Sequence, residues 1–165
     1  MKSSAYKGGG SAPLETRSHS KGPVNIRPAG IEDAERIALL AGQLGYPSSP
    51  TQVTQRLRNL KGDDRHAVFV AESHEGSVIG WVHAFVCSLV ESDPYAEIGG
   101  LIVDEQHRGA GVGGLLLEQA ELLARAKDCA SLRLRSNIIR KEAHAFYLKR
   151  GYTITKTQHA FAKTL

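Results

Sequence analysis

The sequence predicts a mixed α/β domain with a mostly antiparallel central sheet that is flanked by helices. Three observations predict this class. Three β-rich apolar runs follow one another with only short turns between them, as antiparallel strands do. Amphipathic patterns of helical period stand before and after that group. The length of 165 residues fits one domain with a proper core. The predicted order of elements is β-αα-βββ-α-β-α-ββ.

The first elements are a strand and two helices. Residues 24–27 alternate in polarity, as a short strand does. Apolar residues recur at helical spacing over 34–44, and a glycine with a proline beyond it ends that pattern. A second helix is predicted from Pro50 to Gly62. The loop between the two helices contains Tyr46, an aromatic residue that could face a ligand.

The remaining elements follow from the same two periodicities. Three strands are predicted at 67–72, 78–86 and 96–103, with a five-residue hairpin turn after the first and a turn at 91–94 before the last. A long amphipathic helix begins at Leu115. The chain is then predicted to form a strand at 131–135, a helix at 140–150 and a final hairpin from 152–157 and 159–165.

Charge is unevenly distributed along the chain. The formal net charge is +4, but residues 1–22 hold four basic residues and one acidic residue. The remainder is therefore close to neutral, and a basic face for nucleic acid is not indicated. Residues 1–22 are rich in Ser, Gly and Lys, and we expect a disordered tail or a remnant of an expression tag. The folded domain is expected to span 23–165.

Several other classes of protein are not indicated. The sequence has no apolar run of the roughly 20 residues that cross a bilayer, and its first residues lack the apolar core of a signal peptide. A cytoplasmic location without membrane contact is expected. The two cysteines, Cys87 and Cys129, stand far apart in apolar surroundings, and the seven histidines are scattered. We therefore expect no disulfide framework and no metal site.

A glycine-rich stretch from Val103 to Gly114 joins an apolar strand to the long helix. Glycines let a backbone approach a ligand closely, and amides at a helix start attract anions. Arg108 stands at the mouth of this loop, where a guanidinium could also reach a phosphate. The stretch predicts a loop that binds a pyrophosphate.

The spelling of residues 109–114 also satisfies G-x-G-x-x-G, the pattern of dinucleotide-binding domains. Three observations count against that cofactor. The loop lies deep in the chain after a hairpin, whereas the dinucleotide fold opens with this turn. The next strand ends in Arg135-Ser136-Asn137, without an acidic residue for a ribose. One β-α-β unit leaves no second half. A P-loop is excluded because no Lys-Ser or Lys-Thr follows the glycines.

Two motifs resemble those of the GCN5-related N-acetyltransferases. Arg108-x-x-Gly111-x-Gly113 matches their acyl-CoA signature. Ser136-Asn137-x-x-Arg140-x-x-Ala143-His144-x-Phe146-Tyr147-x-x-x-Gly151-Tyr152 resembles their second signature, at about the usual distance. The order of elements from residue 24 onward is also similar. The resemblance implies the acyl-CoA N-acyltransferase fold, with acetyl-CoA as co-substrate and no metal.

The resemblance also implies where acetyl-CoA binds. Its pantetheine arm would lie along the strand before the loop, which splays from the following strand, and Gly99-Gly100 is a plausible site for the bulge involved. The implied cofactor-binding residues are Leu101, Ile102, Val103, Arg108, Gly109, Ala110, Gly111, Val112, Gly113 and Gly114, together with Asn137 and Tyr147.

The chemistry that the resemblance implies is direct attack of an amine on the thioester in a ternary complex. Tyr147 stands at the position of the general acid that protonates the thiolate. A backbone N–H near Leu101 or Val103 would hold the oxyanion. The candidate base is Glu97, acting directly or through water, and Glu91 and Asp93 are the alternatives.

The expected function is transfer of an acetyl group from acetyl-CoA to a primary amine, with a small molecule as the acceptor. A protein or peptide amine and a catalytically silent acyl-CoA sensor are the alternatives, and a dinucleotide-dependent oxidoreductase is a further rival. The acceptor would contact the loop around Tyr46, residues 88–95 and the C-terminal hairpin. Dimers are common among the proteins that the chain resembles, so a homodimer is expected by default.

Overall fold

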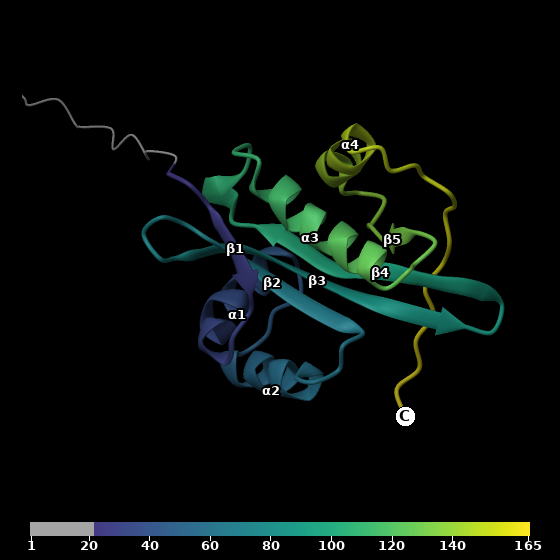
Figure 1. The fold of residues 1–165 in the computed structure, drawn as a ribbon, viewed down its shortest axis with the longest axis horizontal. Coiled ribbons are helices and arrows are strands. Elements are labelled where there is room, and N and C mark those ends of the chain that lie inside the picture. The colour runs from purple at the N-terminus through teal and green to yellow at the C-terminus, as the bar shows by residue number, and fades with distance from the viewer. Residues whose placement is uncertain (1–21) are drawn as a thin grey trace, which may run out of the picture.

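A computed structural model describes residues 22–165, and in this part of the chain a five-stranded sheet forms the centre of the molecule (Figure 1). The strands lie in chain order, and every neighbouring pair is antiparallel except the last, which is parallel. The mixed, mostly antiparallel sheet predicted from the sequence is thereby confirmed. The strands are β1 (Asn25–Pro28), β2 (His66–Glu72), β3 (Val78–Leu89), β4 (Ser92–Val103) and β5 (Leu132–Leu134).

Helices cover both faces of the sheet (Figure 1). Val70 packs in one core with helix α1, whereas the next residue, Ala71, packs in another core with helix α3. Successive strand residues point to opposite faces, so the two helices lie on opposite sides of the sheet. The helical elements are η1 (Ile31–Asp33), α1 (Ala34–Gln43), α2 (Pro50–Leu60), η2 (Glu105–His107), α3 (Val112–Ala126) and α4 (Lys141–Lys149).

The start of α2 shows how the sequence sets these elements. The Ser49 hydroxyl accepts a hydrogen bond from the Gln52 amide at 3.2 Å, and the Gln52 side chain accepts one from the Ser49 amide at 2.9 Å. This reciprocal pair is a capping box, and Pro50 occupies the first helical turn, where a missing N–H is harmless. The capping box therefore fixes the residue at which the loop that contains Tyr46 ends and α2 begins.

A bulge in β4 lies where the pairing of β4 with the outer strand β5 ends. In the β3–β4 ladder His83 pairs with Gly100 and Ala84 pairs with Ile98, so Gly99 is the extra residue. This confirms the bulge that the paired glycines predicted. The parallel β4–β5 ladder ends at Ile98 and Leu134, beside the bulge. From Gly99 onward β4 therefore has an edge that β5 does not cover.

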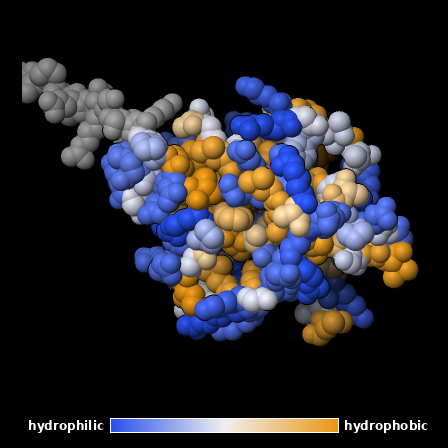
Figure 2. Space-filling view, in the orientation of Figure 1, coloured by the Kyte–Doolittle hydropathy of each residue, from blue (hydrophilic) through white to orange (hydrophobic). Residues whose placement is uncertain are grey.

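The expected C-terminal hairpin is wrong, because residues 152–165 contain no strand. A hairpin needs an apolar face to bury, and this segment is mostly Thr, Lys, Gln and His. Its Phe161 and Leu165 side chains are fully or almost fully exposed. The two outer strands of the sheet are short, with four residues in β1 and three in β5. In Figure 2, apolar groups project at the lower edge of the molecule, where Figure 1 places the C-terminus.

Smaller differences concern the ends of elements. The expected turn at 91–94 is mostly strand, because β3 continues to Leu89 and β4 starts at Ser92. The long helix begins at Val112, within the glycine stretch, rather than at Leu115. The predicted tail, residues 1–22, lies outside the described residues except for Gly22. Within residues 22–165 no helix has the length and apolarity needed to cross a membrane.

Candidate functional site

The glycine loop connects η2 with the first turn of α3. Gly109 has a φ of +75° and Gly111, the residue that caps α3, has a φ of +85°. No described atom outside the adjoining residues lies within 4 Å of a Cβ built on either residue. The backbone conformation, rather than lack of space, is therefore what calls for glycine at both positions. The loop leads into the N-terminus of α3, and a helix N-terminus is an arrangement that binds anions.

A buried carboxylate fixes the start of this loop. Asp104, at the end of β4, accepts a hydrogen bond from the Gln106 amide at 3.0 Å and one from Arg36 Nη2 of α1 at 2.6 Å. Burial by itself would raise the pKa of Asp104, but these hydrogen bonds outweigh it and hold the pKa below its usual value. The loop is thereby anchored to α1 on the opposite face of the sheet.

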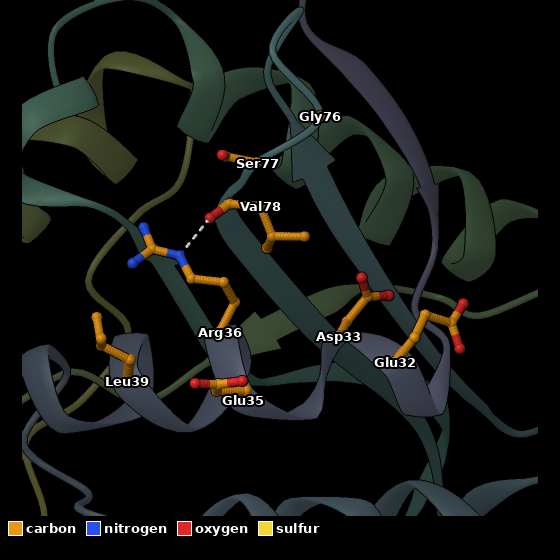
Figure 3. Close-up of a pocket in the computed structure, with 8 residues that line it drawn as sticks. All are labelled: Glu32, Asp33, Glu35, Arg36, Leu39, Gly76, Ser77 and Val78. Carbon is orange, nitrogen blue, oxygen red and sulfur yellow. Dashed lines mark hydrogen bonds between the residues drawn. The ribbon is translucent and has the colours of Figure 1, made fainter.

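Arg36 also lies at the side of the pocket drawn in Figure 3. Its Nε donates to the Val78 carbonyl at 2.8 Å, and the pocket, of about 320 Å³, lies between α1 and the turn that precedes β3. Carboxylates of Glu32, Asp33 and Glu35 line it. None of the residues expected to bind acetyl-CoA is among its lining residues, so this pocket is separate from the candidate site.

Two arginines flank the glycine loop. Arg108 folds back onto the strand before it, where its Nε donates to the Val103 carbonyl at 3.1 Å, and its Nη2 lies 3.7 Å from Glu105. Arg150, at the end of α4, covers Gly114 so closely that a Cβ there would collide with its guanidinium. Sequence reasoning missed Arg150. In the sequence, Arg150 stands out only as a basic residue just before Gly151. Its contact with Gly114 depends on how α3 and α4, which are far apart in the sequence, pack together.

Tyr147 of α4 packs in the core on the α3 side of the sheet. Its ring packs against Phe146 and Tyr152, with centroids 5.1 and 5.7 Å away, in the core under α3. Burial raises the pKa of Tyr147 to about 12, and the nearby Arg140 charge offsets this only in part. The phenol is therefore protonated at neutral pH and can act as a proton donor.

The second motif forms the turn that leads into α4. The Asn137 side chain accepts a hydrogen bond from the Ile139 amide at 3.2 Å, and the Asn137 carbonyl lies 3.0 Å from Nε2 of His144. Arg140 donates to the Leu44 carbonyl at the end of α1. The charge of the same arginine also acts on Tyr147, which packs in the core on the α3 side of the sheet. Cofactor contact by Asn137 stays a prediction.

The sheet face on the α1–α2 side carries an unusual set of side chains next to the bulge. Trp81, His83 and Phe85 of β3 point to this face, and Gly99 and Gly100 of β4 leave room for their rings. A Cβ on Gly100 would stand 2.7 Å from the Trp81 ring. These rings form a floor beside the place where β4 and β5 part.

The three acidic candidates for the base do not gather at this face. Glu97 is buried, and its Oε1 accepts hydrogen bonds from Arg135 Nε at 3.0 Å and Nη2 at 2.6 Å. Asp93 lies four residues before Glu97 on β4, about 13 Å away along an extended strand, and Glu91 is in the adjoining turn. Both are exposed. The structure therefore brings only Glu97 to the bulge.

Other polar groups have no evident part in the site. Cys87 and Cys129 are free thiols. Within residues 22–165 no group of three or more His, Cys, Asp or Glu residues is arranged to hold a metal ion.

Comparison with known proteins connects this geometry to a family. The sequence profile described as "Acetyltransferase (GNAT) family" matches residues 33–152. The chain is 34% identical over 146 residues to the aminoalkylphosphonate N-acetyltransferase of Salmonella typhimurium, which covers 85% of this chain and 90% of that protein. It is 30% identical over 136 residues to the aminoglycoside N(6′)-acetyltransferase type 1 of Stenotrophomonas maltophilia, with 79% and 87% covered.

A solved structure shares the fold. The aminoglycoside 6′-N-acetyltransferase of Acinetobacter baumannii superimposes with a TM-score of 0.75 at 20% sequence identity. The match covers 87% of this chain and 99% of that one. The glycine loop and the helix that carries Tyr147 both fall inside the region matched by the family profile.

Proposed function

Because the chain belongs to the acetyltransferase (GNAT) family, we propose that it transfers the acetyl group of acetyl-CoA to the primary amine of a small molecule. The reaction proceeds by direct attack in a ternary complex. The observation that carries this proposal is the glycine loop with two left-handed residues, Gly109 and Gly111, at the start of α3 and beside the uncovered edge of β4.

The pyrophosphate of acetyl-CoA binds to the amides from Arg108 to Gly114. The dipole of α3 and the two flanking guanidiniums, Arg108 and Arg150, supply positive charge there. To meet a phosphate, Arg108 exchanges its contacts with Val103 and Glu105 for the ligand. Release of the Val103 carbonyl frees an acceptor at the edge that the pantetheine arm follows.

The pantetheine arm adds to the edge of β4 along Leu101, Ile102 and Val103. The bulge at Gly99 and the end of the β4–β5 ladder at Ile98 support this placement, since they leave the edge uncovered by β5. Asn137, in the turn that follows β5, hydrogen-bonds the arm. The thioester then lies next to the bulge, between the two faces of the sheet.

Tyr147 protonates the departing thiolate. Its burial keeps the phenol protonated, and Arg140 is near enough to stabilise the phenolate that forms. A backbone N–H of Leu101 or Val103 holds the oxyanion. Glu97 is a candidate for the base, but proton transfer to its Oε1 would cost the ion pair with Arg135.

The charges near the bulge favour an acceptor that carries an anionic group. Glu97 is paired with Arg135, whose side chain is 72% exposed. Arg133 shares that face and stacks on the Tyr95 ring at 3.8 Å. Because Arg133 and Arg135 are on this face and Glu97 is the one of the three candidate acids that lies at the bulge, a polycation would meet repulsion there. We propose an amine with a phosphonate or phosphate group, in keeping with the aminoalkylphosphonate relative.

A thermal melting experiment tests the cofactor. CoA at 100 times its Kd should raise the stability by about 2.7 kcal/mol, and NAD or NADP should leave the melting temperature unchanged. A shift with NAD and none with CoA would overturn the donor assignment.

A thiol-release assay over an amine panel tests the acceptor. We expect turnover with 2-aminoethylphosphonate and much less with kanamycin, spermidine or a lysine peptide. Preference for kanamycin or for the peptide would reject the anionic acceptor while leaving acetyl transfer intact. CoA binding without turnover on any amine would indicate a silent sensor domain.

A further inference from the structure

Two histidines on neighbouring strands point to the sheet face on the α1–α2 side, next to the bulge. They have no part in the function proposed above. His66 of β2 and His83 of β3 point to the same sheet face, and Nδ1 of His66 lies 3.0 Å from Nε2 of His83. We propose that His83 is the general base for the acceptor amine and that His66 passes the proton to solvent. This inference rests on the proposed function, because the amine must attack at the bulge.

The bulge places His83 within reach of the reacting amine. His83 pairs with Gly100, beside the extra residue Gly99. Its Nδ1 lies 3.4 Å from the position that a Cβ on Gly99 would take. Since Gly99 has no side chain, this edge of the ring faces the uncovered part of β4, where a bound thioester lies. An amine at that point is within direct reach of Nδ1, or one water away from it.

The hydrogen bond between the imidazoles uses Nε2 of His83 and leaves its Nδ1 available to the amine. When His83 donates its Nε2 proton to Nδ1 of His66, its own Nδ1 carries a lone pair toward the bulge. In that arrangement the proton of neutral His66 is on Nε2. His66 is only partly buried, so its proton can be exchanged with water.

The surroundings keep His83 uncharged, so its lone pair is available at neutral pH, and a proton taken up there is passed on to His66 rather than held. Its pKa is lowered to about 4, chiefly by burial and further by the neighbouring His66. Phe85 packs against both imidazoles, with ring centroids 5.4 Å from His66 and 5.6 Å from His83. The charged side chains of β4 and β5 on this face are Glu97, Arg133 and Arg135, and no described carboxylate bonds to either imidazole.

The proton transfer balances without a further reactant. The acceptor ammonium gives a proton to Nδ1 of His83 while the Nε2 proton of His83 moves to Nδ1 of His66. His66 releases its Nε2 proton to water. The amine nitrogen bonds to the acetyl carbon, the carbon–sulfur bond breaks, and Tyr147 protonates the thiolate. The second amine proton is lost to water, and solvent reprotonates Tyr147 and returns the two histidines to their starting tautomers. The products are the amide, CoA and one proton.

His83→Gln is the direct test, with His74→Gln as the matched control. His74 lies in the exposed turn between β2 and β3 and touches none of the groups assigned here. We expect His83→Gln to lower kcat by about 100-fold, the low end for a general base, while the KM for acetyl-CoA stays within twofold. His66→Gln should lower kcat by a smaller factor, and His74→Gln should match the wild type.

A pH profile separates a base from a packing residue. The loss of kcat in His83→Gln relative to the wild type should become smaller as the pH rises toward the pKa of the acceptor amine. The amine is then already deprotonated and needs no base. Added imidazole should restore part of the activity of His83→Ala.

A kcat for His83→Gln within threefold of the wild type, or a deficit that is constant with pH, would overturn the relay. If His83→Gln does not fold, the pH dependence of kcat in His66→Gln tests the relay instead. Failure of the wild type with acetyl-CoA and every amine would reject the proposed function instead.

Discussion

Nε and Nη2 of Arg135 both donate to Oε1 of Glu97, at 3.0 and 2.6 Å, across the parallel pair β4 and β5. The contact lies next to Ile98 and Leu134, the last pair before the two strands part. The carboxylate that the sequence offers as a base is therefore a link between the strands that form the opening.

We predict that Glu97→Gln mainly affects stability and acceptor KM. A Gln oxygen can still accept from Arg135 but loses the charge, which should lower the free energy of unfolding by about 1 kcal/mol. The fall in kcat should stay below tenfold. Denaturant unfolding and steady-state kinetics measure both effects. A fall of 100-fold or more in kcat with unchanged stability would restore Glu97 as the base.

Tyr147→Phe should lower kcat by about 100-fold, because it removes only the proton that the thiolate needs. The affinity for acetyl-CoA, measured by calorimetry, should change little, since the ring still packs on Phe146. Tyr152→Phe is the matched control. Its hydroxyl bonds to Glu121 at 3.3 Å in the same core, and its loss should leave kcat near the wild-type value. Equal effects of the two substitutions would assign Tyr147 to packing.

Gly111→Ala tests the backbone conformation of the loop. At a φ of +85° a Cβ costs about 1–2 kcal/mol, although the space around it is free. The loop should relax away from this geometry, and the Kd for CoA should rise at least tenfold. Gly42→Ala is the control, because that site on α1 is equally open and its backbone is helical. We expect it to be neutral or stabilising by up to about 1 kcal/mol. Unchanged CoA affinity in Gly111→Ala would contradict the pyrophosphate assignment.

Acid should destabilise the protein through His83. Its pKa is about 4 in the folded chain and near 6.5 when unfolded. The unfolded chain therefore binds the proton first, so the free energy of unfolding should fall as the pH drops from 6.5 to 4. Asp33 and Asp104 have lowered pKa values, so their contribution is lost mainly below 3.8. The free energy of unfolding of His83→Gln, measured in urea, should change less between pH 6.5 and 4 than that of the wild type. Identical slopes would contradict a partly buried, neutral His83.

Much of the fold could be predicted because its signals are local. Periodicity located the strands and helices, and the paired glycines at 99–100 marked the bulge that the β3–β4 register confirms. The C-terminal hairpin failed because alternation in 152–165 says nothing about what the segment can bury. Tyr152 packs in the core, but Ile154, Phe161 and Leu165 farther along the segment are exposed.

The site divides in the same way. The conformation of Gly111 follows from its place between a strand and a helix, and the structure bears out the need for glycine there. The position of Arg150 over Gly114, the pairing of Glu97 with Arg135 and the contact of His66 with His83 each join segments that are distant in the sequence. Such contacts depend on strand register and helix packing, which no single stretch of sequence contains.

The central claim is that this protein moves an acetyl group from acetyl-CoA to a small amine. The most direct measurement incubates the purified chain with acetyl-CoA and 2-aminoethylphosphonate and quantifies free CoA thiol and N-acetylated amine in the same sample. We predict that the two products appear in equal amounts and that Gly111→Glu abolishes both. Thiol release without acetylated amine, or neither product with any amine of the panel, would contradict the claim.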